Sequence, residues 1–520
     1  MPVVKNVSAI GVDLGTRNAF CACIDGEGRP VVVPGRWGRL STPSVVAWDN
    51  GWVVGEDAVH LSLRGGRSIW WDIKRKVGSG FRAQCDGRSL AAEELLVPLI
   101  SALREDAEAF MGVFVSSCVL AVPACFTFVQ REALTRAAAA AGLREVRIVN
   151  EPTAAALAFG REGRFLVLDF GAGTVDVSVV ESEGGVWQVL DSAGSASVGG
   201  YDFDLALAEW LRERLSLDPL PPEDPLWRVL VLEAETIKIA LSTCRSHAWT
   251  PPRLPGRDRS AFQVEREELE RMVRFSIRRV VHIVHRLWSR YEPERLLLAG
   301  GSARIPLLRE ILEQEITAPD RMSLCPEDSI AVGAALCTRT GRGRLLLDVL
   351  SGDVGFVRDG ESTVLIAAGT PLPFSARAVF VPSRPGKATL SIFQDVGDIQ
   401  PKRTILSVIE PYVAAGEEVA IHCTLDISGL LHLSIGNGRA TTDVPLLPPE
   451  RGSAARPSGR RQRLRELKLR LAAFETLLSP LQQNRLHLLT QRIENIENVG
   501  NEDPSIEILE RLVSDLEAEL

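Results

Sequence analysis

Short apolar runs alternate with longer stretches of helical periodicity over residues 1–341, which predicts the alternating strands and helices of an α/β domain. Two of the apolar runs, residues 9–12 and 165–168, are each followed by an acidic residue, one or more glycines and a second strand-like run. This order of apolar and polar positions predicts two β-hairpins with acidic, glycine-containing turns. Because the two hairpins are alike, we expect a duplicated domain.

A second pattern follows the α/β region. A polar break leads into an apolar connector at residues 342–349, which is unusual because linkers are normally polar. Short alternating runs separated by turn residues then fill residues 350–447 and predict an all-β domain. Periodicity alone leaves open that the three leucines of the connector are instead the first strand of the all-β domain.

The last part of the chain, residues 448–520, has a third composition. Residues 448–459 are rich in Pro, Gly and Arg and indicate a second linker, and residues 460–520 have the pattern of amphipathic helix. We therefore expect a short helical segment, either lid-like or an ordinary small helical bundle.

Composition narrows the class of protein. The chain has 520 residues, of which 45% are hydrophobic and 24% charged, as in ordinary globular proteins of several domains. Its net charge of −8 argues against a general nucleic-acid binder, and no apolar run is long enough to span a bilayer. Residues 1–10 have no signal-peptide pattern, and nine scattered cysteines fit a reducing compartment. These features predict a cytoplasmic protein.

The two acidic turns carry the chemistry. They read Asp13-Leu-Gly15-Thr16 and Asp169-Phe-Gly171-Ala-Gly173-Thr174. Glycines let backbone N–H groups approach an anion closely, and a neighbouring carboxylate can hold a hydrated magnesium ion. One such turn alone could be a plain hairpin turn. Two copies, with a third strand–glycine–helix element at residues 296–306, favour a site that grips one polyphosphate from both sides.

Seven short motifs, in this order along the chain, resemble the heat shock protein 70 (DnaK-type) chaperone family. They lie at residues 11–16, 72–75, 121–124, 149–156, 169–176, 199–204 and 300–306, and a β segment ending at residue 432 is also similar. The resemblance covers about residues 7–435. It implies an α/β fold with an actin-like two-lobed ATPase domain at 1–341, followed by a β-sandwich peptide-binding domain at 350–447.

The resemblance also implies roles at an ATP site with Mg²⁺ as cofactor. Asp13 and Asp169 would hold Mg²⁺ through water, and Thr16 and Thr174 would bind phosphate oxygens. Lys74 would neutralise charge on the γ-phosphoryl group, while Glu151 and Asp176 would orient water or act as base. On composition alone, Lys74 is equally compatible with a surface lysine, and Glu151 with a helix N-terminus.

The remaining nucleotide contacts follow from the same resemblance. Glu235 and Lys238 would bind the ribose, Ser242 the base, and Arg304 would stack on adenine. The other expected nucleotide-binding residues are Gly15, Gly171, Gly173, Gly199, Gly200, Gly300, Gly301 and Ser302. An i,i+3 ion pair on an exposed helix is the structural alternative for Glu235 and Lys238. The chain departs from the family's usual residues at Arg17, Asn18, Ala172 and Ile239.

Further positions match residues that couple the two domains or line the peptide pocket. The coupling positions are Pro123, Arg131, Arg147, Asn150, Leu346, Leu347 and Asp348, and those of the pocket are Phe356, Phe380, Leu390 and Leu430. The pocket residues could equally be plain core of a β-sandwich. The partners implied are unfolded or extended polypeptides, a J-domain co-chaperone and, beyond these, a nucleotide exchange factor.

Two functions remain in view. The first is a slow ATP hydrolase that acts as a chaperone in protein folding and the stress response, binding apolar peptides and releasing them on ATP binding. The second is a nucleotide-gated interaction protein with little or no hydrolysis and one dedicated client. A small-molecule kinase of the same superfamily is disfavoured, because such kinases need no peptide-binding β domain.

Overall fold

The computed structural model describes residues 8–446, except 67, 196–197, 223, 254–259, 321–325, 340–344, 397–401, 427–428, 437–440 and 445. The predicted helical segment at 448–520 lies outside the described residues. The chain divides into two compact units, Met1–Pro449 and Glu450–Leu520, and the described residues all belong to the first.

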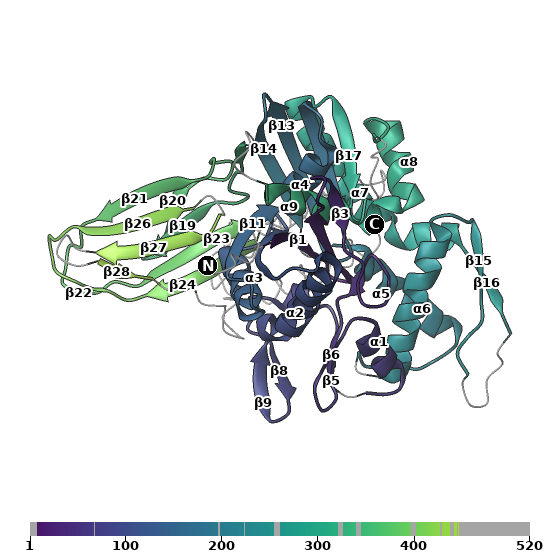
Figure 1. Cartoon of the computed structure of the whole chain (residues 1–520). Helices are drawn as coiled ribbons and strands as arrows, with labels where there is room; N and C mark the ends of the chain where they lie inside the picture. The colour runs from purple at the N-terminus through teal and green to yellow at the C-terminus, as the bar shows by residue number, and fades with distance from the viewer. Residues whose placement is uncertain are drawn as a thin grey trace, which may run out of the picture. The chain divides into compact units, whose positions relative to one another are not determined.

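The first large sheet is built around a hairpin (Figure 1). Its strands in spatial order are β11 (Glu145–Asn150), β10 (Val115–Val122), β1 (Ser8–Leu14), β2 (Asn18–Ile24) and β3 (Pro30–Val32), with β4 (Thr42–Pro43) also paired to β2. β1 and β2 are antiparallel, which confirms the first predicted hairpin, and β10 lies parallel to β1 on its other side.

The second large sheet repeats this pairing. Its strands in order are β17 (Arg295–Ala299), β12 (Gly163–Phe170), β13 (Val175–Glu183), β14 (Val186–Ser195) and β18 (Leu345–Leu347). β12 and β13 form the second predicted hairpin, and β17 is parallel to β12 as β10 is to β1. β18 pairs in parallel with β14, so the connector leucines extend this sheet and are not the first strand of the all-β segment.

Two helices lie between the large sheets, and further helices cover their outer faces. The inner pair is α4 (Glu151–Phe159) and α9 (Ser329–Cys337). A Cβ at Gly333 would come within 1.8 Å of the Ala154 carbonyl oxygen, so glycine permits their close crossing. The outer helices are α2 (Ala92–Met111) and α3 (Phe128–Ala140) on the first sheet and α7 (Arg266–Tyr291) on the second. α5 (Gly200–Arg214) and α8 (Pro306–Glu315) pack on α7, and α6 (Pro225–Leu241) packs on α5.

Smaller elements complete the α/β part. They are α1 (Glu56–Leu63), β5 (Val46–Trp48), β6 (Trp52–Val54), β7 (Ile69–Trp70), β8 (Arg82–Cys85), β9 (Arg88–Ala91), β15 (Ser246–Trp249), β16 (Phe262–Glu265) and the 3-10 turns η1 (Ile73–Lys76) and η2 (Gly301–Arg304). Within the described ranges, no helix is long and apolar enough to span a bilayer.

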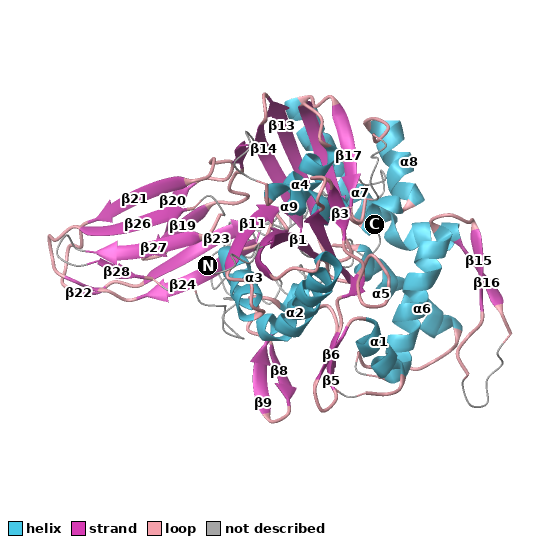
Figure 2. Cartoon of the chain, viewed as in Figure 1, coloured by secondary structure: helices cyan, strands magenta, loops and turns pink. Residues whose placement is uncertain are grey.

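The segment after the connector contains strands and loops only, in the part of it that the structure describes (Figure 2). One sheet has β20 (Glu361–Ile366), β19 (Val354–Arg358), β23 (Leu390–Val396) and β24 (Lys402–Ile409); a second has β21 (Phe374–Phe380), β26 (Val419–Leu425), β27 (Leu431–Gly436) and β28 (Thr441–Asp443); β22 (Gly386–Lys387) pairs with β25 (Tyr412–Val413). Both sheets contribute to one apolar core. The described unit is therefore a mixed α/β region followed by an all-β region.

Candidate functional site

The two acidic turns meet each other. A Cβ placed on Gly173 would lie 2.2 Å from the Thr16 hydroxyl oxygen, so only a glycine lets the second turn approach the first this closely. Ala172 lies outside the group of residues with positive φ, which allows its side chain in the second turn. The turn also closes on itself, because the Gly171 N–H donates to the Thr174 carbonyl oxygen at 3.1 Å. Both predicted phosphate turns thus face one place.

Four buried carboxylates gather behind these turns. Burial, followed by repulsion from Glu151, raises the pKa of both Asp13 and Asp176 to about 7. The pKa of Asp169 is raised well above its usual range, by burial first and then by Glu151. Asp169 Oδ1 is buried and has no hydrogen-bond partner among the described residues. Concentrated negative charge with an unpaired oxygen is suited to attract a cation.

Lys74 supplies positive charge to this carboxylate cluster. Its side chain is buried, and its ammonium group donates to Glu151 Oε1 at 2.6 Å. The burial of Lys74 excludes the alternative of a surface lysine. Burial lowers its pKa, but attraction to Glu151 and Asp13 outweighs this and leaves the pKa above its usual value. Lys74 is therefore charged and held beside both acidic turns.

Asp176 is fixed by the backbone. It lies directly opposite Asp169 in the β12–β13 ladder, and its Oδ1 accepts a hydrogen bond of 2.9 Å from the Cys125 N–H. Cross-strand partners lie on the same face of a sheet, so the two carboxylates share one side of the hairpin. Asp176 is thereby oriented toward the cluster with one oxygen already engaged.

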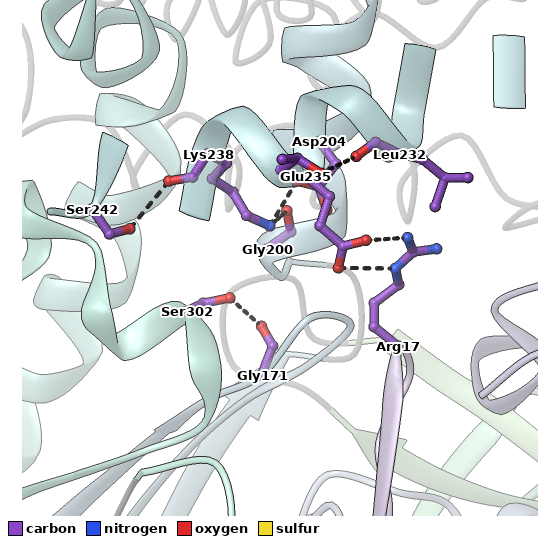
Figure 3. Close-up of polar contacts among 10 residues, drawn as sticks. Arg17, Gly171, Gly200, Asp204, Leu232, Glu235, Lys238, Ser242 and Ser302 are labelled. Carbon is purple, nitrogen blue, oxygen red and sulfur yellow. Dashed lines mark hydrogen bonds and ion pairs between the residues drawn. The ribbon is translucent and has the colours of Figure 1, made fainter. Parts of the chain in front are cut away.

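Two pairs of glycines, Gly199–Gly200 and Gly300–Gly301, lie beside the second turn, and Figure 3 labels Gly200 among them. The Ser302 hydroxyl donates to the Gly171 carbonyl oxygen at 2.9 Å. Side chains would not fit at Gly200, where a Cβ would lie 2.2 Å from Ser302 Oγ, or at Gly199, where it would meet the Ala172 backbone. Gly300 has φ +76°, a conformation that favours glycine. A Cβ on Gly301 would make only an ordinary contact, with Glu327 Cγ at 3.6 Å.

The predicted ribose-binding side chains already have partners. Glu235 forms a forked ion pair with Arg17, and Lys238 pairs with Asp204 at 2.7 Å and donates to the Gly200 carbonyl oxygen at 2.9 Å (Figure 3). Both residues lie on α6, and these partners lie on other elements, unlike the i,i+3 pair that was the structural alternative. The contacts hold α6 against the first turn and against α5.

The two residues expected at the base lie on different elements, Ser242 at the end of α6 and Arg304 in η2. The Ser242 hydroxyl donates to the Lys238 carbonyl oxygen at 3.1 Å at the end of α6. Arg304 is exposed and makes a forked ion pair with Glu327. Ile239, where the family has a second arginine, is 61% exposed, so it leaves the face of α6 open to solvent.

The donor set fits a hydrated magnesium ion. Within the described ranges, no three or more His, Cys, Asp or Glu side chains are arranged to ligate an ion directly. Asp13 and Asp169 are nevertheless carboxylates on facing turns, and one Asp169 oxygen is unpaired. Mg²⁺ prefers oxygen donors and usually keeps several of its waters, so two carboxylates are sufficient.

Comparison with known proteins identifies the family. The family model described as Hsp70 protein matches residues 9–86 and 79–434. The chain belongs to the Hsp70 family. It is 31% identical over 455 residues to the Chaperone protein DnaK of Mycoplasma mobile, covering 82% of this chain and 75% of the relative. It is similarly 32% identical to that of Mycoplasmopsis pulmonis (81% and 75%) and 30% identical to that of Thermotoga neapolitana (85% and 80%).

Most of the coupling residues expected of an Hsp70 protein lie together. Arg131 donates to the Asn150 side chain at 2.6 Å and to the Pro123 carbonyl oxygen at 3.4 Å. Asp348 faces Arg131 and accepts hydrogen bonds from Asn150, although burial raises its pKa. Arg147 lies apart from this group and donates to the Cys337 carbonyl oxygen at 2.6 Å. Leu346 and Leu347 are in β18 beside β14.

The four predicted pocket residues do not form one group. Phe356 and Leu390 are buried in the core of the all-β region, and Phe380 packs against that core. Leu430 instead packs against the core of the first large sheet. The geometry of the first two is that of core residues, which was the alternative left open by the sequence.

Sequence reasoning missed several residues at the site. The charge partners Arg17 and Asp204 were not predicted, although Asp204 belongs to the matched motif at 199–204. Gln394 was also missed: it is buried, and its side-chain oxygen accepts from the Phe128 N–H at 3.0 Å. The exchange of the family's usual residue at Arg17 and the position of Asp204 in a matched motif were signals in the sequence; Gln394 had none.

Proposed function

We propose that this chain is an ATP-dependent molecular chaperone that binds and releases extended apolar segments of unfolded proteins. Residues 1–341 would form an actin-like ATPase domain, 342–349 a linker and 350–447 the peptide-binding β-sandwich. The similarity to relatives named Chaperone protein DnaK supports the class of function. The observation that carries the proposal is the meeting of two acidic glycine turns over the buried Lys74–Glu151 pair.

Each group in this arrangement has a role in phosphoryl transfer to water. Asp13 and Asp169 would hold hydrated Mg²⁺, which would neutralise phosphate charge when bound. Thr16 and Thr174 offer hydroxyl and backbone N–H groups to phosphate oxygens. The fixed Lys74 ammonium would stabilise charge developing on the γ-phosphoryl group without reorganising. Glu151 or Asp176 would orient the attacking water and accept its proton.

The same arrangement offers a route for coupling to peptide release. Asn150 immediately precedes Glu151 and contacts Arg131 and Asp348, so the pair beside the phosphates is adjacent in the chain to the connector's contact. We propose that ATP binding favours this docked connector and that a J-domain co-chaperone acts on it. A nucleotide exchange factor would reset the cycle. The protein would work in the cytoplasm.

Steady-state ATP hydrolysis with and without an unstructured apolar peptide tests the proposal. We expect slow turnover in the wild type that the peptide raises, and no turnover in Lys74→Ala. Lys387→Ala removes an exposed lysine of the all-β region and serves as the control that keeps wild-type hydrolysis. A Lys74→Ala variant that hydrolyses ATP at the wild-type rate would contradict the assignment of Lys74.

The second candidate, a nucleotide-gated interaction protein without turnover, is favoured by one observation. The carboxylate expected to bind ribose is held by Arg17, and the second arginine of the family is replaced by exposed Ile239. ATP binding that alters the rate of peptide release but is not followed by phosphate production would support this candidate over the first.

A further inference from the structure

The Arg17–Glu235 pair joins two parts of the α/β region that are 218 residues apart. Arg17 directly follows Thr16 in the first phosphate turn, and Glu235 lies on α6, which packs on α5 (Figure 3). One edge of the guanidinium is engaged: Nε donates to Glu235 Oε1 at 3.3 Å and Nη2 donates to Oε2. The pair thus connects the first phosphate turn to the predicted ribose-binding helix.

The surroundings of Arg17 make it costly to leave this guanidinium unpaired. Its side chain is 7% exposed and that of Glu235 is 21% exposed. The guanidinium also lies over the rings of Trp71 and Tyr201, at 5.0 and 5.4 Å from their centroids. Removing one partner of a buried ion pair is strongly unfavourable because the other charge is left without compensation. A ligand that takes Glu235 must therefore satisfy Arg17.

Two other acids lie near Arg17. Asp204 is engaged by Lys238 at 2.7 Å. Asp72 attracts Arg17 and accepts a hydrogen bond from the Tyr201 hydroxyl, while its buried Oδ1 has no partner among the described residues. Asp72 alone, with one oxygen facing a desolvation cost of its own, does not provide the two-oxygen contact that Glu235 gives to the guanidinium. A phosphate or diphosphate matches the planar fork of a guanidinium as well as a carboxylate does. In a nucleotide the phosphates lie next to the ribose, and Arg17 stands next to the phosphate turn.

We propose that Arg17 is a phosphate-binding residue of this chain that exchanges Glu235 for the phosphates of a nucleoside di- or triphosphate, releasing Glu235 to the ribose. This inference rests on the proposed nucleotide site and adds a reason for it to prefer nucleotides over nucleosides. A nucleoside without phosphates must break the Arg17–Glu235 pair and offers Arg17 no new anion, which leaves the guanidinium with the weaker attraction of Asp72. A nucleotide compensates Arg17, so the chain discriminates strongly for the phosphate-bearing ligand.

Calorimetric titration of the full chain with ADP and, separately, with adenosine tests the exchange. In Arg17→Met, loss of a charge-assisted contact is expected to weaken ADP binding roughly 10- to 100-fold. Adenosine binding is expected to be unchanged or tighter, because Glu235 is already free. The opposite response of the two ligands is the signature, since a merely structural role for Arg17 would weaken both.

Arg228→Met is the matched control. Arg228 is an arginine on α6, the helix that carries Glu235, and it donates to the Gly66 carbonyl oxygen at 3.5 Å, a contact without an acidic partner. The Arg228→Met variant is expected to bind ADP and adenosine as the wild type does. Parallel weakening of both ligands in Arg17→Met, or unchanged ADP affinity, would overturn the exchange while leaving the nucleotide site intact. Failure of the wild type to bind ADP would instead overturn the proposed function and the exchange with it.

Discussion

The Lys74–Glu151 pair allows a stability prediction whose size follows from the geometry. In Lys74→Met the side-chain volume is nearly kept, but Glu151 stays buried among Asp13, Asp169 and Asp176 without its ammonium partner. Breaking a buried pair from one side costs about 3–5 kcal/mol. We expect the nucleotide-free protein to lose about that much unfolding free energy, far more than an exposed ion pair would contribute.

The reverse change is expected to cost less. In Glu151→Gln, Lys74 keeps the attraction of Asp13 and Asp169, so its charge remains compensated. The double variant removes both charges and should recover to within about 1 kcal/mol of the wild type, because an unpaired buried charge no longer exists. This order, with Lys74→Met the least stable of the three, follows from the excess of carboxylates in the cluster.

Urea unfolding of the nucleotide-free protein, followed by tryptophan fluorescence, measures these differences. A loss of about 3 kcal/mol corresponds to a midpoint lower by roughly 1 M or less, because the m-value of a chain of this size is about 3 kcal/mol/M or larger. Lys387→Met, at an exposed position, is the control for the Lys-to-Met exchange. A wild-type midpoint in Lys74→Met, or a larger loss in Glu151→Gln than in Lys74→Met, would refute the reasoning.

Two further predictions use other parts of the site. Gly173→Ala places a Cβ 2.2 Å from the Thr16 hydroxyl oxygen, so it should separate the two turns and abolish ADP binding in a titration. The control Gly26→Ala, whose Cβ has no atom within 4 Å, should bind ADP normally. Equal ADP binding by both variants would contradict the role of the facing turns. Burial, opposed by Lys238, raises the pKa of Asp204 from 3.8 to about 6. Between these two values the unfolded chain loses this proton more readily than the folded protein does, so the unfolding free energy falls as pH rises from 4 to 7. Relative to wild type, Asp204→Asn should therefore gain about 3 kcal/mol of unfolding free energy over that range, measured by urea unfolding at each pH; a pH-independent difference would rule this out.

Local patterns were sufficient for elements whose structure depends on neighbouring residues. The two acidic hairpins and the all-β segment follow from apolar alternation and glycine placement, which fix strand and turn locally. For the leucine connector, periodicity could not decide between a linker and a first strand of the all-β region. Its pairing with β14 was not predictable, because it depends on which sheet edge is free in the folded chain.

At the candidate site, too, features encoded in local motifs could be predicted and contacts between distant elements could not. The facing turns and Lys74 were predicted because sequence motifs carry them, yet the burial of Lys74 is a tertiary property that composition could not give. Arg17 and Glu235 are joined across 218 residues, and Leu430 packs on the first sheet rather than with Phe356 and Leu390. Pairings of this kind depend on how separate elements meet, and a side chain's type is compatible with many partners.

The positions of the buried charges suggest why one small change at the phosphates could reach the connector. Glu151 pairs with Lys74 at the candidate phosphate site. The preceding residue, Asn150, accepts a hydrogen bond from Arg131 at 2.6 Å and donates to Asp348 of the connector, so two adjacent residues contact the site and the connector. Each of these contacts is buried and cannot weaken without exposing an unpaired charge or dipole, which favours two discrete arrangements over a gradual one. If ligand phosphates share the Lys74 ammonium with Glu151, the Lys74–Glu151 contact weakens at the start of α4, next to the contact of Asn150 with Asp348. Coupling is then the consequence of an acidic site that has too few cations to satisfy every carboxylate at once.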